Sequence, residues 1–404
     1  SKAPSREELP KGVEEVGSKF PYQEFLQLAD EYGKKVAGEL NAKMPKFGRD
    51  YGWNKEGDTM KVAMVWTGEG ISEGMRTCLD KNPKVIICTD DSHKLIGLTD
   101  KDMTKYTASN QYVDVGCAEQ NMAMVSAGLA KEGFIPMGNG YTGFCVGRAY
   151  DHIRTSILTT NFNAKYFPTE GLLWGDGLLH EGLEGISLTY YLPNWHVSFP
   201  CDNIEARKAT ITAISDIKGP VVTFQERAPK PAVTKEETPY KFGVANIIRY
   251  RGRQPQFADA FETKLSTEWK SEKADLAIIA CSSLVAEAMR AAYILKEEKG
   301  IETIVVNLHT IKPLDKAGIL KAIQGVKAVI THEQHAKGGL GNIVAGVIME
   351  GGLANAPKFK MIGIENAFGQ TAKPWELIQH YGLTAEHVAT TALNVLGVKA
   401  AALA

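Results

Sequence analysis

Short apolar runs that alternate with helical segments dominate the chain after residue 60. The first runs of strand length are Lys61–Thr67, Lys84–Thr89, Tyr112–Val115, Val197–Phe199 and Pro220–Gln225. Apolar runs separated by helical stretches of about ten residues or more are typical of a parallel α/β sheet, because a crossover between parallel strands needs that length. We therefore predict an α/β domain over residues 61–229.

A second unit with the same alternation is predicted over residues 274–404. Its expected strands are Asp275–Cys281, Thr303–Leu308, Ala328–Thr331 and Lys358–Ile364. Its expected helices are Ala286–Lys299, Lys316–Ile323 and a last helix near Ala385–Leu396. The predicted fold class is therefore α/β, with two parallel-sheet domains.

The remaining segments are polar. Residues 1–60 are expected to form an N-terminal helical extension, with one helix from Tyr22 to Asn41 whose apolar residues recur close to the helical period. Residues 230–273 are rich in proline and charge. We interpret them as a linker or insertion that contains one edge strand, Gly243–Tyr250.

Composition narrows the class of function. The 404 residues include 46 basic and 47 acidic side chains, and this balance disfavours binding to nucleic acid or to an anionic membrane surface. No run approaches the roughly 20 apolar residues of a membrane span, and the polar N-terminus does not resemble a signal peptide. The six cysteines lie far apart without a CxxC pair, as expected for reduced thiols in a cytoplasmic protein.

The segment Asp114–Ala130 carries the clearest chemistry. A strand is expected to end near Val115 and a helix to begin at about Ala118, which places Glu119 in the first helical turn. The exposed N–H groups and the positive end of the helix dipole stabilise a carboxylate there. The helix that follows is almost uncharged, so we expect it to be buried in a sheet or a subunit interface. A carboxylate that leads a buried helix needs a hydrogen-bonding partner.

Two aromatic residues follow in a glycine-rich turn. Tyr141 and Phe144 lie in the segment Gly140–Arg154, directly before an expected helix. Aromatic rings on such a turn are either core residues or one wall of a pocket for a flat ring.

Together these segments resemble the transketolase family. The sequence Gly-Cys-Ala-Glu-Gln-Asn-Met at residues 116–122, followed by the aromatic turn, is similar to the pyrimidine-binding domain. The other segments that follow the family in order are Asp176–His180, Leu192–Trp195, Pro200–Asp202, Gly219–Arg227, His309–Asp315, Gly338–Gly341 and Phe368–Gln370. The resemblance covers roughly residues 61–400. It implies a pyrimidine-binding domain over 61–229 and a transketolase C-terminal domain over 274–404.

The resemblance assigns roles to six residues. Glu119 would hydrogen-bond a ring nitrogen of the aminopyrimidine of thiamine diphosphate and so promote the cofactor's reactive form. Tyr141 and Phe144 would pack against the pyrimidine ring. Asp176 and His180 would contact the hydroxyls of the donor ketose, and Arg227 would bind a distal phosphate. Glu119 and His180 are the expected catalytic residues.

The resemblance also implies a partner. Transketolases have a diphosphate domain upstream of the pyrimidine domain, and this chain begins too late to contain it. The magnesium and diphosphate ligands are therefore expected on another polypeptide, so that this chain is one subunit of a split enzyme, a heterotetramer of two plus two chains. The expected reaction is transfer of a two-carbon ketol group from a ketose, phosphorylated or otherwise anionic, to an aldose.

Three departures leave the substrate open. The segment Gly175–Gly177 is one residue shorter than the family pattern, Pro168–Thr169 replace a phosphate-binding histidine, and no arginine precedes the turn at Gly68–Gly70. Two further activities share the glutamate and the fold, namely the beta subunit of a 2-oxo acid dehydrogenase and a deoxyxylulose-phosphate-synthase-like enzyme. A non-catalytic interaction subunit is the third alternative, although the presence of Glu119, His180 and Arg227 argues against it.

Three short motifs have simpler explanations. Gly175–Gly177 with Asn203 imitates a magnesium motif, but Leu178–His180 follow it directly and the pyrimidine domain explains Asn203. His332–His335 has a metal-like spacing, and polar turn residues are the favoured interpretation. Gly338–Gly341 lacks the full dinucleotide-binding spacing, so close strand–helix packing explains its glycines. No metal ligand is therefore expected in this chain.

Overall fold

The structure is a computed structural model that describes residues 43–55, 59–172, 177–335, 338–353 and 355–398, together with six isolated positions between 27 and 39. Residues 1–44 form one unit and residues 45–404 another. The helix predicted over 22–41 lies mostly outside the described residues. The six isolated positions in this range are helical.

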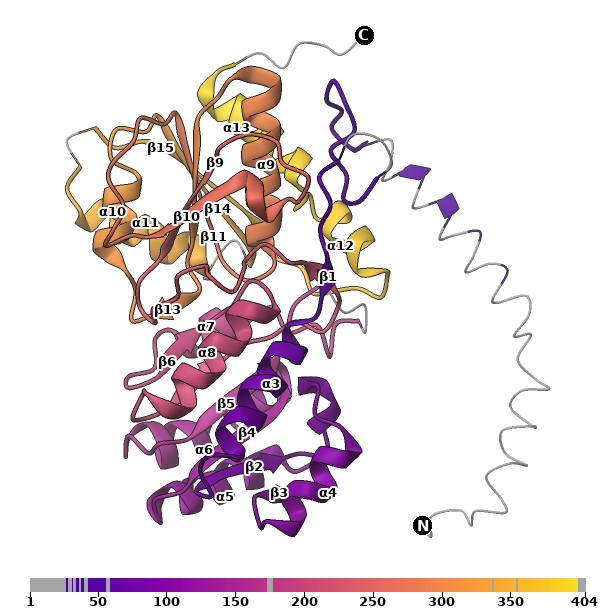
Figure 1. Cartoon of the computed structure of the whole chain (residues 1–404), viewed down its shortest axis with the longest axis vertical. Helices are drawn as coiled ribbons and strands as arrows, with labels where there is room; N and C mark the ends of the chain where they lie inside the picture. The colour runs from indigo at the N-terminus through magenta and orange to yellow at the C-terminus, as the bar shows by residue number, and fades with distance from the viewer. Residues whose placement is uncertain are drawn as a thin grey trace. The chain divides into compact units, whose positions relative to one another are not determined.

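The first domain is built on a seven-stranded sheet with the order β13-β6-β7-β5-β4-β2-β3 (Figure 1). Its strands are β2 (Val85–Thr89), β3 (Tyr112–Asp114), β4 (Ile135–Tyr141), β5 (Lys165–Thr169), β6 (His196–Ser198), β7 (Val221–Thr223) and β13 (Thr310–Lys312). All neighbouring strands are parallel except β13 and β6. The parallel α/β sheet predicted from the apolar runs is thus confirmed.

Helices connect these strands. They are α3 (Thr67–Leu79), α4 (Asp100–Ala108), α5 (Glu119–Lys131), α6 (Tyr150–Ile153), α7 (Gly185–Thr189) and α8 (Asn203–Ser215), with a 3₁₀ turn at His93–Ile96 and π-helical segments at Thr142–Arg148 and Arg154–Leu158. The run at Lys61–Thr67 is not a strand of this sheet. It contains only β1 (Met64–Val65), which pairs with β8 (Lys230–Pro231), and α3 begins at Thr67.

The second domain contains a six-stranded sheet with the order β10-β9-β12-β11-β14-β15. Its strands are β9 (Asn246–Tyr250), β10 (Phe261–Leu265), β11 (Leu276–Ala280), β12 (Thr303–Asn307), β14 (Ala328–His335) and β15 (Lys358–Ile364). The strands β12, β11, β14 and β15 are parallel, whereas β9 and β10 are antiparallel to their neighbours. The sheet is therefore mixed.

The segment 230–273 does not behave as a linker. It supplies β9 and β10, and β9 lies between β10 and β12 rather than at an edge. All five residues of β9 are buried. The sequence does not show that β9 lies inside the sheet, because Arg249 is of a type that is usually exposed. A buried arginine needs ion pairs, and its partners cannot be identified from the sequence.

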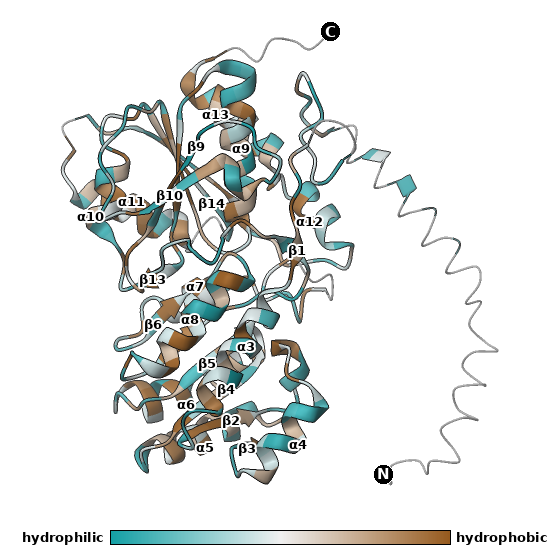
Figure 2. Ribbon diagram, viewed as in Figure 1, coloured by the Kyte–Doolittle hydropathy of each residue, from teal (hydrophilic) through white to brown (hydrophobic). Residues whose placement is uncertain are grey.

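The helices of the second domain cover a strongly apolar sheet. They are α9 (Leu284–Lys299), α10 (Lys316–Ala322), α11 (Leu340–Glu350), α12 (Pro374–His380) and α13 (Ala385–Leu396), with a 3₁₀ turn at Ala258–Ala260. Strand β11 is hydrophobic along its whole length, and β14 is hydrophobic over its first residues, Ala328–Ile330 (Figure 2). Nearly all of α9 is buried, and it packs against α13.

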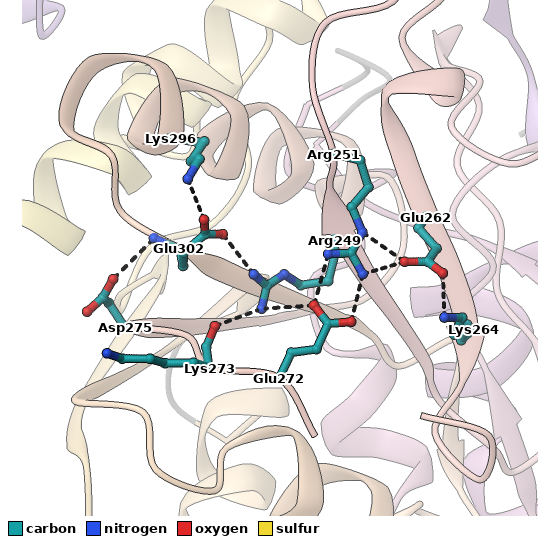
Figure 3. Close-up of polar contacts among 9 residues, drawn as sticks. All are labelled: Arg249, Arg251, Glu262, Lys264, Glu272, Lys273, Asp275, Lys296 and Glu302. Atoms are coloured by element: carbon teal, nitrogen blue, oxygen red, sulfur yellow. Dashed lines mark hydrogen bonds and ion pairs between the residues drawn. The ribbon is translucent and has the colours of Figure 1, made fainter. Parts of the chain in front are cut away.

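The charged segment of β9 and β10 pairs with itself and with the rest of the second domain. Figure 3 shows the Arg249 guanidinium between Glu302, at 2.7 Å, and Glu272, at 4.0 Å. Arg251 contacts Glu272, at 2.7 Å, and Glu262. A hollow of about 770 Å³ lies among these side chains, and none of the predicted site residues lines it. We interpret this network as the ion pairing that permits a buried arginine in β9.

The two domains share structure. The chain leaves the second sheet after β12, and the next strand, β13, pairs with β6 of the first sheet. Lys312 at its end donates to the carbonyl of Tyr190 at 2.9 Å. The domains are thus joined by strand pairing as well as by packing.

All six cysteines are free thiols, and only Cys117 is exposed. Within the ranges that the structure describes, every helix is too short or too polar to cross a membrane.

Candidate active site

Tyr141 and Phe144 lie where β4 ends and a π-helix begins. Tyr141 is the last residue of β4, and Phe144 lies in the π-helix Thr142–Arg148. Short π-helical segments occur frequently at functional sites. Here Phe144 and Arg148 point to the same place, with the Arg148 guanidinium 4.8 Å from the centre of the Phe144 ring.

Glu119 begins α5, as predicted, and its side chain is buried. Both carboxylate oxygens accept from Arg148 Nη1, at 3.1 and 2.9 Å. The Arg148 side chain remains half exposed, whereas that of Glu119 is only 7% exposed. The partner that a buried carboxylate requires is therefore an arginine of the same chain. Arg148 was not predicted as a site residue, although it lies in the segment Gly140–Arg154 that contains the two aromatic residues.

A second buried carboxylate lies close to Glu119. Asp90 follows β2 and accepts from the Ser92 hydroxyl. Burial raises the pKa of Asp90 to about 6, against the hydrogen bond from Ser92, and the negative charge of Glu119 adds to the increase. The two carboxylates therefore influence each other electrostatically.

His180 and Arg227 reach the aromatic pair from two different loops. The His180 ring centre lies 4.6 Å from that of Tyr141 and 5.5 Å from that of Phe144. Arg227 Nη1 donates to the Tyr141 hydroxyl at 2.8 Å. Tyr141 thus contacts two of the three residues that were predicted to bind the substrate.

Five of the six predicted site residues are therefore connected by direct contacts, with Arg148 as the link to Glu119. A continuous series of contacts runs from Arg227 through Tyr141, His180 and Phe144 to Arg148 and Glu119. Asp176, the sixth, lies outside the described residues.

The histidine and glycine motifs of the second domain are structural where they can be described. His332 is fully buried, its Nε2 lies 2.9 Å from the carbonyl of Leu383, and burial lowers its pKa to about 4. The N–H groups of Leu340 and Gly341, at the start of α11, both donate to the Glu333 carboxylate at 2.6 Å. Those two donors are therefore not available to a nucleotide phosphate. In the part of the chain that the structure describes, no cluster of three His, Cys, Asp or Glu side chains could hold a metal ion.

Comparison with known proteins identifies the family. The pyrimidine-binding domain of transketolase matches residues 63–230, and the transketolase C-terminal domain matches residues 266–388. The chain is 32% identical over 337 residues to a transketolase C-terminal section from Methanocaldococcus jannaschii, and the match covers 82% of this chain and 96% of that protein. The chain belongs to the transketolase family.

Two further relatives of this transketolase-family chain are a transketolase subunit and a split-gene transketolase. A 6-deoxy-6-sulfo-D-fructose transketolase subunit from a Clostridium species is 30% identical over 287 residues, covering 70% of this chain and 80% of the subunit. A split-gene transketolase, solved as an inactive beta4 tetramer, superposes with a TM-score of 0.68 at 28% identity, covering 83% of this chain and all of that one. The family and the α/β fold that the sequence predicted are confirmed.

The residues at the site fit one end of thiamine diphosphate. A buried carboxylate at a helix start beside two aromatic rings matches what an aminopyrimidine needs, namely an acceptor for a ring proton and flat apolar walls. The fit is therefore to the pyrimidine half of the cofactor.

Proposed function

We propose that this chain is the pyrimidine-binding subunit of a split transketolase, which transfers a two-carbon ketol group from an anionic ketose to an aldose. The contact series from Arg227 to Glu119 carries the proposal. It brings a cofactor-activating carboxylate, an aromatic wall, a histidine and a distal cation together from separate segments. Such a convergence of different polar groups is typical of an active site.

Each residue has a role in this proposal. Thiamine diphosphate, when bound, supplies the carbon that carries the ketol group. Glu119 holds the ring proton of the pyrimidine, and Tyr141 and Phe144 bind its faces. His180 donates to or accepts from hydroxyls of the ketose, and Arg227 binds the distal anion through a charge-assisted bond. Asp176 is proposed to assist His180.

Arg148 gives the subunit a resting state. In this chain alone the Glu119 carboxylate is occupied by Arg148, and half of the Arg148 side chain is exposed. Binding of the pyrimidine ring requires one oxygen of Glu119 to exchange Arg148 for the ring nitrogen. Arg148 can then retain the other oxygen, because its Nη1 contacts both.

The proposed partner is a diphosphate-domain subunit that supplies the magnesium and diphosphate ligands, in a heterotetramer of two plus two chains. The split relatives support a separate partner subunit. Helix α5 offers a surface for it, because Gln120, Asn121, Met124 and Gly128 are exposed and uncharged. Met124 is 47% exposed. The cores of subunit interfaces are depleted of charged residues, and methionine is enriched there. A cytoplasmic location remains a prediction.

The proposed substrate is a ketose with a distal anion, either phosphate or sulfonate. Arg227 is the residue assigned to it, and the sulfofructose relative shows that transketolase subunits can act on a sulfonated sugar. The test is reconstitution with the diphosphate-domain subunit, thiamine diphosphate and Mg²⁺. Ketol transfer is then measured from a ketose phosphate, a sulfo-ketose and an uncharged ketose of equal length. Exclusive turnover of a 2-oxo acid would instead support the dehydrogenase or deoxyxylulose-phosphate-synthase alternative.

Arg227→Ala separates the substrate classes. The variant is expected to lose about ten- to a hundredfold in kcat/KM for anionic ketoses, mostly through KM, because the anion is remote from the reacting carbon. The uncharged ketose should be processed by both enzymes alike. An equal loss for charged and uncharged ketoses would make Arg227 a structural residue.

A further inference from the structure

A single side chain of the second domain connects the two loops that carry the substrate residues. Gln334 lies in β14 and is 6% exposed. Its amide oxygen and its amide nitrogen each contact a different segment of the first domain. One segment leads to His180 and the other contains Arg227.

The first contact is to the loop that carries His180. The N–H of Leu172 donates to Gln334 Oε1 at 2.5 Å. Gly171, directly before it, has φ +95°, and a Cβ there would lie 2.5 Å from Gln334 Oε1. Only glycine allows the backbone to approach the amide this closely in this conformation.

The second contact is to the residue before Arg227. Gln334 Nε2 donates to Glu226 Oε1 at 2.7 Å, and the Ser282 hydroxyl of the second domain donates to the same oxygen. Lys230 donates to Glu226 Oε2 at 2.9 Å. Glu226 is 3% exposed, so its position is fixed by these partners and not by water.

The two contacts suit an amide. The Leu172 N–H needs an acceptor and the Glu226 carboxylate needs a donor, and the glutamine side chain offers these on two separate atoms. Glutamate in this position could accept from Leu172 but would bring a second carboxylate against Glu226. Leucine could satisfy neither.

We propose that Gln334 is a positioning residue, through which the C-terminal domain sets the distance between the His180 loop and Arg227. The inference rests on the proposed function, because it gives the C-terminal domain a task in substrate binding. A second contact supports the same coupling. A Cβ at Gly177, three residues before His180, would lie 2.7 Å from the hydroxyl of Thr371 in the second domain. The chain leading to His180 therefore lies against the C-terminal domain at two points, Leu172 and Gly177.

The test compares Gln334→Leu with Gln111→Leu. Gln111 is a matched control because it is also 6% exposed and its Nε2 donates to buried backbone carbonyls, those of Leu79, Asn82 and Val85. Amide hydrogen exchange is measured on the full chain, alone and assembled, over residues 170–184 and 224–230. Gln334→Leu is expected to raise exchange about tenfold in both segments, whereas Gln111→Leu should leave both unchanged.

Kinetics of the assembled enzyme provide the second measurement. Gln334→Leu should raise KM for an anionic ketose about tenfold and also lower kcat. The reason is that the segments carrying Arg227 and His180 would lose the hydrogen bonds that hold them in place. Gln334→Glu should retain protection at 170–184 and lose it at 224–230. Adding Glu226→Gln to Gln334→Glu restores a donor–acceptor pair and should recover protection at 224–230 beyond that of Gln334→Glu alone.

The proposal is wrong if Gln334→Leu folds and changes neither exchange segment more than the control. If Gln334→Leu does not fold, the Gln334→Glu comparison decides, and equal protection at 224–230 in parent and variant overturns the proposal. Exchange is informative even if the assembled parent proves inactive with every ketose. That outcome would contradict the proposed function and leave the coupling through Gln334 intact.

Discussion

At the scale of single residues, the pairing of Glu119 with Arg148 explains how a buried carboxylate is tolerated before the cofactor is present. An isolated buried charge would cost several kcal/mol, whereas a hydrogen-bonded ion pair with a half-exposed arginine costs far less. The same pair is weak enough to rearrange, because Arg148 keeps contact with solvent. The sequence correctly predicts Glu119 in the first turn of a helix. It does not predict that Arg148 points toward Glu119, because Arg148 lies in a π-helix, and hydrophobic periodicity does not reveal a π-helix.

Glu119→Gln tests the carboxylate itself. The amide has nearly the same shape and can still accept one bond from Arg148, so the assembly should fold with an unchanged melting temperature. The amide carries no negative charge, so it cannot stabilise a protonated pyrimidine ring. Activity should therefore fall by at least about 10²–10⁴-fold. Hydrogen–deuterium exchange at the thiazolium carbon should slow in parallel. Unchanged exchange would remove Glu119 from this role.

Asp90 predicts a pH-dependent stability. Its pKa is raised to about 6 in the folded chain, so the folded state binds this proton more tightly than the unfolded state between about pH 4 and 6. Ionised Asp90 therefore destabilises the chain above pH 6, and the cost disappears as the pH falls through this range. Asp90→Asn should stabilise by up to about 3 kcal/mol at pH 7.5 and by almost nothing at pH 4. Thermal melts across this range measure it, with the exposed neighbour variant Asp91→Asn as the control. A constant difference at all pH values would contradict the assignment.

At the scale of elements, two glycines show which helix faces are already packed within the chain. In α3 a Cβ at Gly70 would overlap the backbone carbonyl of Asn203, at the start of α8. Gly128 in α5 has no atom within 4 Å of the same position. One helix is therefore closely packed against its neighbour, and the other presents an open face.

The two glycine-to-alanine variants should therefore have opposite effects. Gly70→Ala should destabilise the isolated chain by about 1–3 kcal/mol, because α3 and α8 must separate. Gly128→Ala should stabilise it by up to about 1 kcal/mol through helix propensity. If the partner subunit covers α5, Gly128→Ala should also weaken assembly, which sedimentation of the mixed subunits would detect. Stabilised monomer with unchanged assembly would place the interface elsewhere.

Element prediction succeeded where apolar runs are continuous and failed where polar residues occupy buried strands. β11 and β12 were predicted within about a residue at each end, because their sequences are uninterrupted apolar runs. β4 and β5 were missed, since glycine, asparagine and proline break the apolar pattern of β4 and a buried lysine begins β5. β14 continues to His335 through buried polar residues such as Glu333 and Gln334, which the sequence presents as a turn.

At the scale of the whole molecule, the two domains cannot be considered separately. β13 pairs across to the first sheet, and Gln334 and Ser282 hold the segment beside Arg227. Sequence motifs identified both domains but not this coupling, because the residues that meet are more than 100 positions apart, as in the contact of Gln334 with Glu226. Long-range side-chain pairs of this kind leave no periodic signal in one sequence.

The isolated chain is expected to be catalytically silent. In the proposed function its site offers the pyrimidine end of thiamine diphosphate a carboxylate and two aromatic rings, but a tight complex also requires the diphosphate and its magnesium ion to be bound, and those ligands are proposed to lie on the partner subunit. Binding free energy from the pyrimidine alone must offset the loss of translational and rotational freedom and the displacement of Arg148 from one oxygen of Glu119, so affinity should be weaker than micromolar. Titration calorimetry of the purified chain with thiamine diphosphate and Mg²⁺ measures this directly, and addition of the diphosphate-domain subunit should produce both tight binding and turnover.

Arg148→Ala provides the internal comparison, because it frees Glu119 without adding any diphosphate ligand and should leave the isolated chain silent. Micromolar binding by the parent chain on its own would show that the cofactor site is not divided between subunits.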